Sequence, residues 1–107
     1  MNTERYDAFV SAVTSECGKA RDAVATDLRR LGLRVAVQSD LRHDPAEVSL
    51  LQTLHDTIQD CDEVHCLIGR RGGDVPSAES AAPFRAFLPA GIAEASYTQW
   101  EYFFARH

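Results

Sequence analysis

The amino-acid sequence predicts an α/β domain of three layers, in which helices cover both faces of a short parallel sheet. Three short and largely apolar segments, at 6–13, 33–38 and 64–69, are typical of strands buried on both faces. Helical patterns separate these segments, so each strand–helix–strand unit is expected to cross over right-handed into a parallel pair. If the two helices cover opposite faces, the strand order is 2-1-3.

Length, composition and charge restrict the protein class. The chain has 107 residues, 45% hydrophobic and 25% charged, with a net charge of -5. This is one domain at most, and the acidic balance argues against a nucleic-acid-binding face, which would be basic. No apolar run is long enough to span a membrane, and the N-terminus shows no secretory signal. Three cysteines without a CxxC motif are expected to be reduced thiols in a cytoplasmic protein. No metal site is predicted, because a zinc site needs four ligands at recognised spacings and the sequence shows none. No cofactor is predicted either.

The clearest helix is expected at 19–31, after the first strand. Between them, the polar segment 14–18 is expected to be a loop at the carboxyl end of the strand, where open α/β sheets bind ligands. The alternative is a plain connection in which Thr14 or Ser15 caps the helix. The predicted core face of the helix consists of residues at helical spacing, and arginines such as Arg21 fill the other face. The core-face residues are Ala20, Val24, Leu28 and Leu31.

The second strand, at 33–38, leads into a charged loop at 39–45 that contains Arg42. A helix is expected to begin at Asp44, with proline at its first position and glutamate at its third, and to reach about Cys61. After the third strand, residues 70–95 contain a Gly-Gly pair and three prolines, which predicts a long loop that is either a functional lid or a poorly ordered insertion. Its apolar stretch 83–89 is expected to pack back onto the domain.

The last helix, at 96–107, contains the strongest candidate for a reactive group. Ser96 and Gln99 form a capping-box signature, and Tyr97, Trp100 and Phe104 are expected to share one face. Glu101 follows Trp100 and lies beside this aromatic stripe. Such a carboxylate is a plausible reactive group because desolvation tunes its acidity. The alternative is an ordinary amphipathic helix with a surface glutamate.

Four segments resemble the Toll/interleukin-1 receptor (TIR) domain. The segment 6–11 is similar to its opening strand motif, 31–35 to the entry of its second strand, and 97–101 to the helix with its tryptophan and active-site glutamate. The loop 39–44 matches its switch loop in position. A closer resemblance is to the TIR-like group classed as DUF4062, through the segments 9–16 and 96–101. The likeness covers most of the chain except 70–95.

This resemblance implies a flavodoxin-like or TIR-like fold, with residues 1–107 forming one module near the N-terminus of a larger protein. Members of the group commonly precede a NACHT or NB-ARC module in bacterial signalling or defence proteins. The implied partners are therefore that module and copies of the same domain.

The resemblance also implies a reaction. Several TIR domains cleave NAD+ at the nicotinamide–ribose bond, with NAD+ as substrate, and the helix glutamate corresponds to Glu101. Trp100 and Tyr97 would then wall the site, and Ser11, Ser15 and Arg42 would line it. Two alternatives stay open: a non-catalytic module for self-association, and a nucleotide-sensing domain that binds without cleaving.

Overall fold

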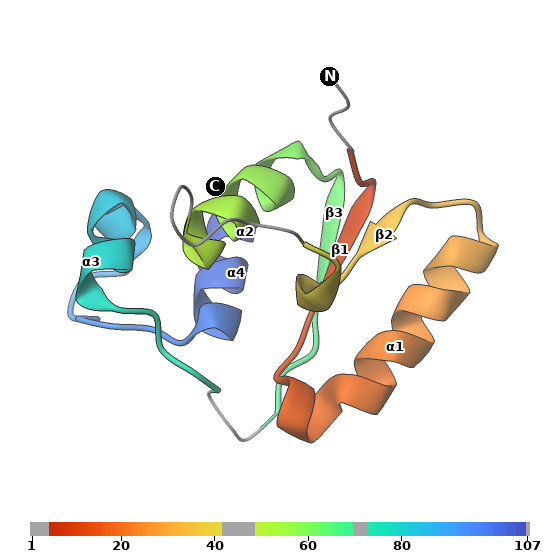
Figure 1. The fold of residues 1–107 in the computed structure, drawn as a ribbon, viewed down its shortest axis with the longest axis horizontal. Helices are drawn as coiled ribbons and strands as arrows, with labels where there is room; N and C mark the ends of the chain where they lie inside the picture. The colour runs from red at the N-terminus through yellow and green to blue at the C-terminus, as the bar shows by residue number, and fades with distance from the viewer. Residues whose placement is uncertain (1–4, 42–48, 70–72, 107) are drawn as a thin grey trace.

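The computed structural model describes residues 5–41, 49–69 and 73–106, and within them three strands form a parallel sheet (Figure 1). The strands are β1 (Ala8–Ser11), β2 (Val35–Ala36) and β3 (Glu63–Cys66). Their order is β2-β1-β3, and β1 pairs in parallel with both neighbours. The predicted α/β class and the predicted strand order 2-1-3 are therefore confirmed.

Helices cover both faces of this sheet, as expected for a doubly wound fold (Figure 1). Successive side chains of a strand point to opposite faces. Ala8 and Val10 of β1 accordingly pack with Ala25 of α1 (Thr14–Arg30). Phe9 points the other way, toward α2 (Leu50–Asp60) and α4 (Tyr97–Ala105). Within the described ranges, no helix is long and apolar enough to cross a membrane.

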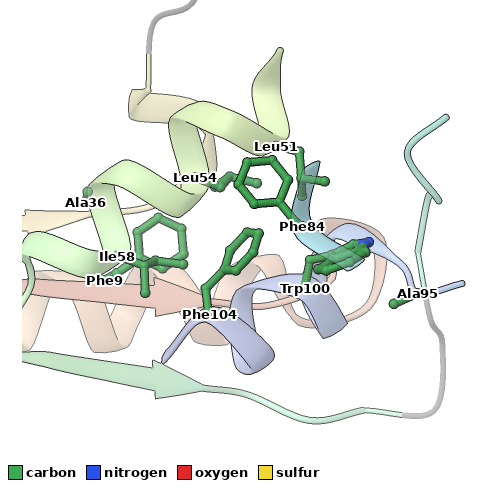
Figure 2. Close-up of a cluster of buried hydrophobic side chains, with 9 residues drawn as sticks. All are labelled: Phe9, Ala36, Leu51, Leu54, Ile58, Phe84, Ala95, Trp100 and Phe104. Atoms are coloured by element: carbon green, nitrogen blue, oxygen red, sulfur yellow. The ribbon is translucent and has the colours of Figure 1, made fainter. Parts of the chain in front are cut away.

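The larger hydrophobic core lies between the sheet and the α2–α4 layer (Figure 2). Trp100 and Phe104 of α4 are buried there, with their ring centroids 5.6 Å apart. Burial of such large side chains is the main favourable term that holds α4 on the sheet. The buried members of the cluster are Phe9, Ala36, Leu51, Leu54, Ile58, Phe84, Ala95, Trp100 and Phe104.

The segment predicted as a long loop contains helical structure in its described part. Ser77 caps the short helix α3 (Ala78–Ala81) by accepting a hydrogen bond from the Ser80 amide, and the 3-10 helix η2 (Ala82–Phe87) follows. The expected packing of 83–89 onto the domain is confirmed, because Phe84 is buried with its ring 5.3 Å from that of Phe104. A structureless loop across 70–95 is thus the wrong description of residues 77–87; residues 70–72 lie outside the described ranges.

The helix α1 begins five residues earlier than predicted, so the prediction of a polar loop at 14–18 is wrong. The amide groups of Glu16 and Cys17 donate to the Val13 carbonyl at 3.1 and 2.7 Å, which closes the first turn. Only Cys17 has non-helical dihedral angles inside the helix. The N-cap residue is Val13, whose side chain makes no capping hydrogen bond, and residues 14 and 15 lie inside the helix, so the alternative with Thr14 or Ser15 as the N-cap is also wrong.

The predicted core face of α1 is confirmed in part: Val24 and Leu28 pack against the cluster that contains Ala25, whereas Ala20 is exposed. Arg21, expected in solvent, is 7% exposed, whereas Leu31, expected in the core, is 77% exposed. The reason is that the helix ends at Arg30, and Leu31 then lies in the turn before Gly32, whose φ is +90°. Glycine adopts this left-handed conformation without strain, so it terminates the helix.

The helix α2 begins at Leu50 with Ser49 as its N-cap, since the Ser49 hydroxyl accepts a hydrogen bond from the Gln52 amide at 3.1 Å. The start predicted at Asp44 lies outside the described residues. The strand β3 ends at Cys66, and its side chains are half-buried or exposed rather than buried on both faces. Among the described strands it pairs only with β1, which leaves it at the edge of the sheet.

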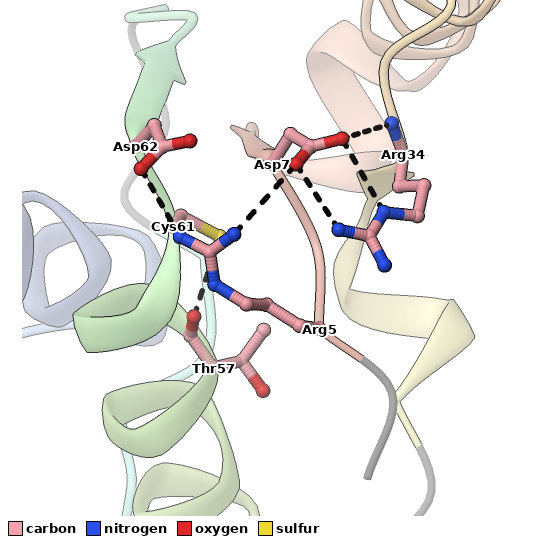
Figure 3. Close-up of polar contacts among 6 residues, drawn as sticks. All are labelled: Arg5, Asp7, Arg34, Thr57, Cys61 and Asp62. Atoms are coloured by element: carbon pink, nitrogen blue, oxygen red, sulfur yellow. Dashed lines mark hydrogen bonds and ion pairs between the residues drawn. The ribbon is translucent and has the colours of Figure 1, made fainter.

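Charged side chains tie the three strands together at their amino ends (Figure 3). Asp7 accepts a hydrogen bond from the Arg34 amide at 2.8 Å and lies 3.4 Å from the Arg34 guanidinium. Arg5 lies between Asp7, at 4.0 Å, and Asp62, at 3.1 Å. The Arg34 amide and guanidinium lower the pKa of Asp7. This network occupies the sheet edge opposite to the one where open α/β sheets bind ligands.

Candidate functional site

The start of α4 is fixed at the carboxyl edge of the sheet by hydrogen bonds. The Ser96 hydroxyl accepts a hydrogen bond from the Gln99 amide at 3.2 Å, and the Gln99 side chain accepts one from the Ser96 amide at 2.8 Å. The predicted capping box is therefore confirmed. The Tyr97 amide donates to the Asp74 carbonyl at 2.9 Å, which joins this end of α4 to the segment that precedes α3.

Glu101 is buried at the carboxyl end of β1. Its side chain accepts a hydrogen bond from the hydroxyl of Ser11, which is the last residue of β1 and is itself buried. Glu101 is only 3% exposed, so it does not lie at the border of the aromatic stripe, as the sequence suggested, but inside the contact between α4 and the sheet. This burial excludes the reading of Glu101 as an ordinary surface residue.

The environment of Glu101 brings its protonation equilibrium close to neutral pH. Burial raises the pKa of Glu101 to about 7, while the Ser11 hydrogen bond and the positive charge of Arg21 act in the opposite direction. Arg21 is nearly buried on α1 and pairs with Asp22 at 3.1 Å. A carboxyl group with a pKa near the working pH can exchange a proton or stabilise positive charge. The chemistry expected of a catalytic carboxylate is thus available here.

Cys66 is the neighbour of Ser11 on the adjacent strand. The two residues are register partners in the β1–β3 pair, and their side chains are within hydrogen-bonding reach. Burial and the charge of Glu101 raise the pKa of the Cys66 thiol. The thiol is therefore protonated at neutral pH and is a weak nucleophile. All three cysteines of the chain are free.

A cleft of about 480 Å³, here called the carboxyl-edge cleft, is lined by residues adjacent to Ser11 and Glu101. Ala12 follows Ser11 directly, and Thr98 lies one helical turn before Glu101, so the neighbours of the buried pair form part of its wall. The volume is within the range of ligand sites. The cleft is lined by Ala12, Val13, Ser15, Gln38, Leu50, Gly73, Asp74, Tyr97 and Thr98.

A second cleft of about 530 Å³, here called the β3–α4 cleft, adjoins the first. Val13 and Thr98 line both clefts, and the Cys66 side chain contributes to the second. Its wall is largely apolar, with Ile68 85% exposed and Tyr102 also exposed. The remaining lining residues are Leu67, Gly69, Ser96, Gln99 and Phe103.

The structure brings together some of the candidate residues from the sequence and separates others. Ser11 contacts Glu101, and both Ser15 and Tyr97 line the carboxyl-edge cleft. Trp100 does not line this cleft, because it is buried in the core beside Phe104 (Figure 2). Adjacent helix positions differ by about 100°, so Trp100 and Glu101 face different surroundings. Arg42 lies outside the described residues.

Sequence reasoning missed Arg21, Cys66 and Asp74. Arg21 lies three and four residues before Val24 and Ala25, so helical spacing would have placed it on the inner face of α1. The strand register would have placed Cys66 beside Ser11. No pattern in the sequence pointed to Asp74, whose position depends on the hydrogen bond between its carbonyl and the Tyr97 amide.

In the part of the chain that the structure describes, no group of three or more His, Cys, Asp or Glu side chains could hold a metal ion. Comparison of the chain with family models, curated proteins and solved structures finds no match. The functional interpretation therefore rests on the geometry and chemistry of the site.

Proposed function

We propose that this chain is a TIR-like effector module of a larger cytoplasmic signalling or defence protein, and that it cleaves NAD+ at the nicotinamide–ribose bond. Glu101 is the proposed catalytic carboxylate. One observation carries the proposal: the Glu101 side chain is buried at the carboxyl end of β1, hydrogen-bonded to Ser11, next to residues that line the carboxyl-edge cleft. Ligands of open α/β sheets bind at this edge.

The chemistry of the bond suits a single carboxylate. When the bond breaks, its electron pair passes to the pyridinium nitrogen, so nicotinamide leaves neutral without needing a proton. Positive charge develops on the ribose and is stabilised by ionised Glu101 in its desolvated position. Water then adds to the ribose carbon and releases its proton, giving ADP-ribose. The ionised form is present at neutral pH because the pKa of Glu101 is about 7.

The cleft residues supply contacts to the substrate in this proposal. Tyr97 offers an aromatic ring for stacking on nicotinamide, and the hydroxyl of Ser15 offers a hydrogen bond to the ribose. Since Glu101 is 3% exposed, the side chains between it and the cleft have to shift when the ribose approaches. Val13 and Thr98, which separate the two clefts, are the side chains expected to move.

The test is nicotinamide release by purified protein concentrated on a bead surface. Wild type is expected to release nicotinamide from NAD+, and Glu101→Gln to lose activity by roughly 100-fold or more, as is typical when a charge-stabilising group is removed. Glu79→Gln is the matched control, because it neutralises an exposed carboxylate on α3. Equal release from wild type and Glu101→Gln, or none from folded wild type, would contradict the proposal.

A second function, non-catalytic self-association, is favoured by the exposed apolar side chains of the β3–α4 cleft. Ile68 and Tyr102 together present apolar surface beside the edge strand β3, and such patches often mark protein interfaces. Under this alternative, Ile68→Glu abolishes self-association in sedimentation experiments, and no variant affects NAD+. Heat of NAD+ binding in calorimetry without nicotinamide release would instead identify a nucleotide-sensing domain.

A further inference from the structure

Ser11 lies between two ionisable side chains, a carboxyl group and a thiol, on the face of the sheet that α4 covers. Phe9 and Ser11 alternate with Val10 along β1, so Ser11 points to the same face as Phe9, toward α4. Glu101 reaches Ser11 from α4, and Cys66 is its register partner on β3. The hydroxyl is therefore the group through which the carboxylate of α4 contacts the sheet.

A serine hydroxyl has one proton to donate and two lone pairs that accept. In this structure the proton goes to the Glu101 carboxylate. The protonated thiol of Cys66 can donate to a Ser11 lone pair but does not compete for that proton. Because Ser11 is also buried, its hydroxyl is committed to Glu101 and is not available to a ligand in the cleft.

The charged and titratable groups near Glu101 come from the elements packed around it. Arg21 on α1 is a nearby cation, and Cys66 on β3 is a neutral thiol. The helix α2 also packs against α4. Of its titratable residues, Asp56 and Asp60 are exposed, and His55 lies against Phe104, with ring centroids 5.1 Å apart. Ser11 is thus a direct hydrogen-bond donor to Glu101.

We propose that Ser11 is a positioning residue, whose hydroxyl orients the Glu101 carboxylate at the end of β1 and favours its ionised form. This role differs from the contact with substrate that the sequence suggested for Ser11. Its relevance to catalysis rests on the proposed function, whereas the effect on the protonation of Glu101 does not.

The experiment is a pH titration of the Glu101 side-chain carboxyl by carbon-13 NMR on glutamate-labelled protein, with the signal assigned by its loss in Glu101→Gln. Ser11→Ala removes the donor with little change of volume. It is expected to raise the midpoint by about one pH unit, as loss of a hydrogen bond to a charged group implies. Ser11→Thr restores a hydroxyl and is expected to keep a midpoint near that of wild type. Cys66→Ala is the matched control, because it removes the other neighbour of Ser11 and leaves the donor in place.

An unchanged midpoint in folded Ser11→Ala, or an equal rise in Cys66→Ala, would overturn the assignment. The titration uses no substrate, so its result is independent of the proposed function. If wild type releases no nicotinamide but Ser11→Ala shifts the midpoint, the proposed function fails and the positioning role holds. If nicotinamide is released but the midpoint does not move, the positioning role fails alone. If the proposed function and the positioning role both hold, the acid limb of the pH–activity profile of Ser11→Ala moves by the same amount as the midpoint of the Glu101 titration.

Discussion

The substitution Glu101→Gln is expected to remove a pH dependence of stability that the wild-type protein shows between pH 4.5 and about 7. Glutamine keeps the shape of the side chain and can accept the Ser11 hydrogen bond, but it does not titrate. Comparison of the two proteins therefore isolates the protonation of one buried carboxyl group.

The sign and the size follow from the two pKa values. The pKa of Glu101 is about 7 in the folded protein, against an ordinary value of 4.5. Between these values the folded state holds a proton that the unfolded chain has released, so stability falls as the pH rises. The contribution is fully present below pH 4.5 and is lost above about pH 7. At 1.36 kcal/mol for each pH unit, the loss is about 3 kcal/mol, which is a large share of the roughly 5–15 kcal/mol typical of a domain.

The assay is urea unfolding of both proteins at a series of pH values, followed by the fluorescence of Trp100, the chain's single tryptophan. In the difference between the two unfolding free energies, the contributions of groups that titrate alike in both proteins cancel. Wild type is expected to lose about 3 kcal/mol relative to Glu101→Gln from the acid to the alkaline end of the series. The control Glu79→Gln, at an exposed carboxylate, should show no such trend. A pH-independent difference between wild type and Glu101→Gln would refute a raised pKa for this group.

Three further substitutions test other parts of the structure. Asp7→Asn is expected to destabilise the fold at neutral pH. Because the pKa of Asp7 is lowered below 3.8, the difference in unfolding free energy between the variant and wild type should shrink as the pH falls below 3.8, which urea unfolding at a series of acid pH values measures. Phe104→Ala is expected to cost roughly 3–5 kcal/mol of unfolding free energy, while Leu31→Ala, at a side chain 77% exposed, should cost at most about 0.5 kcal/mol; similar costs would contradict the assigned core. Ser96→Ala removes the N-cap of α4 and should cost about 1 kcal/mol in thermal unfolding, whereas Ser15→Ala, at an exposed side chain that caps no helix, should cost little.

The strand order could be predicted because it depends on rules that act at the level of whole elements. Three apolar segments separated by helical patterns leave few arrangements once crossovers are right-handed. The prediction failed where a local signal conflicts with tertiary structure. The polar segment around Gly18 is typical of a loop. In the structure, however, the Val13 carbonyl accepts hydrogen bonds from two amide groups, and α1 begins directly after Val13. Arg21 shares the inner face of α1 with Ala25, and Leu31 is exposed because the helix ends at Arg30.

Both residues of the buried pair could be found from the sequence, but their contact could not. Glu101 stood out as a carboxylate beside aromatic residues, and the resemblance implied that Ser11 lines the same site. The hydrogen bond between them could not be predicted, because packing of α4 on β1 brings together residues 90 positions apart. The assignment of Trp100 to the same site followed from the resemblance to the TIR helix. Adjacent residues of a helix point in directions about 100° apart, so Trp100 is buried in the core rather than facing the same surroundings as Glu101.

The proposed role of Glu101 is tested most directly by the pH dependence of nicotinamide release from NAD+ by the bead-bound protein. Because the ionised carboxylate is the form that stabilises the ribosyl cation, release is expected to rise with pH, with a midpoint near the pKa of about 7. Nicotinamide release that does not change across this range, or none at any pH from the folded protein, would contradict the account.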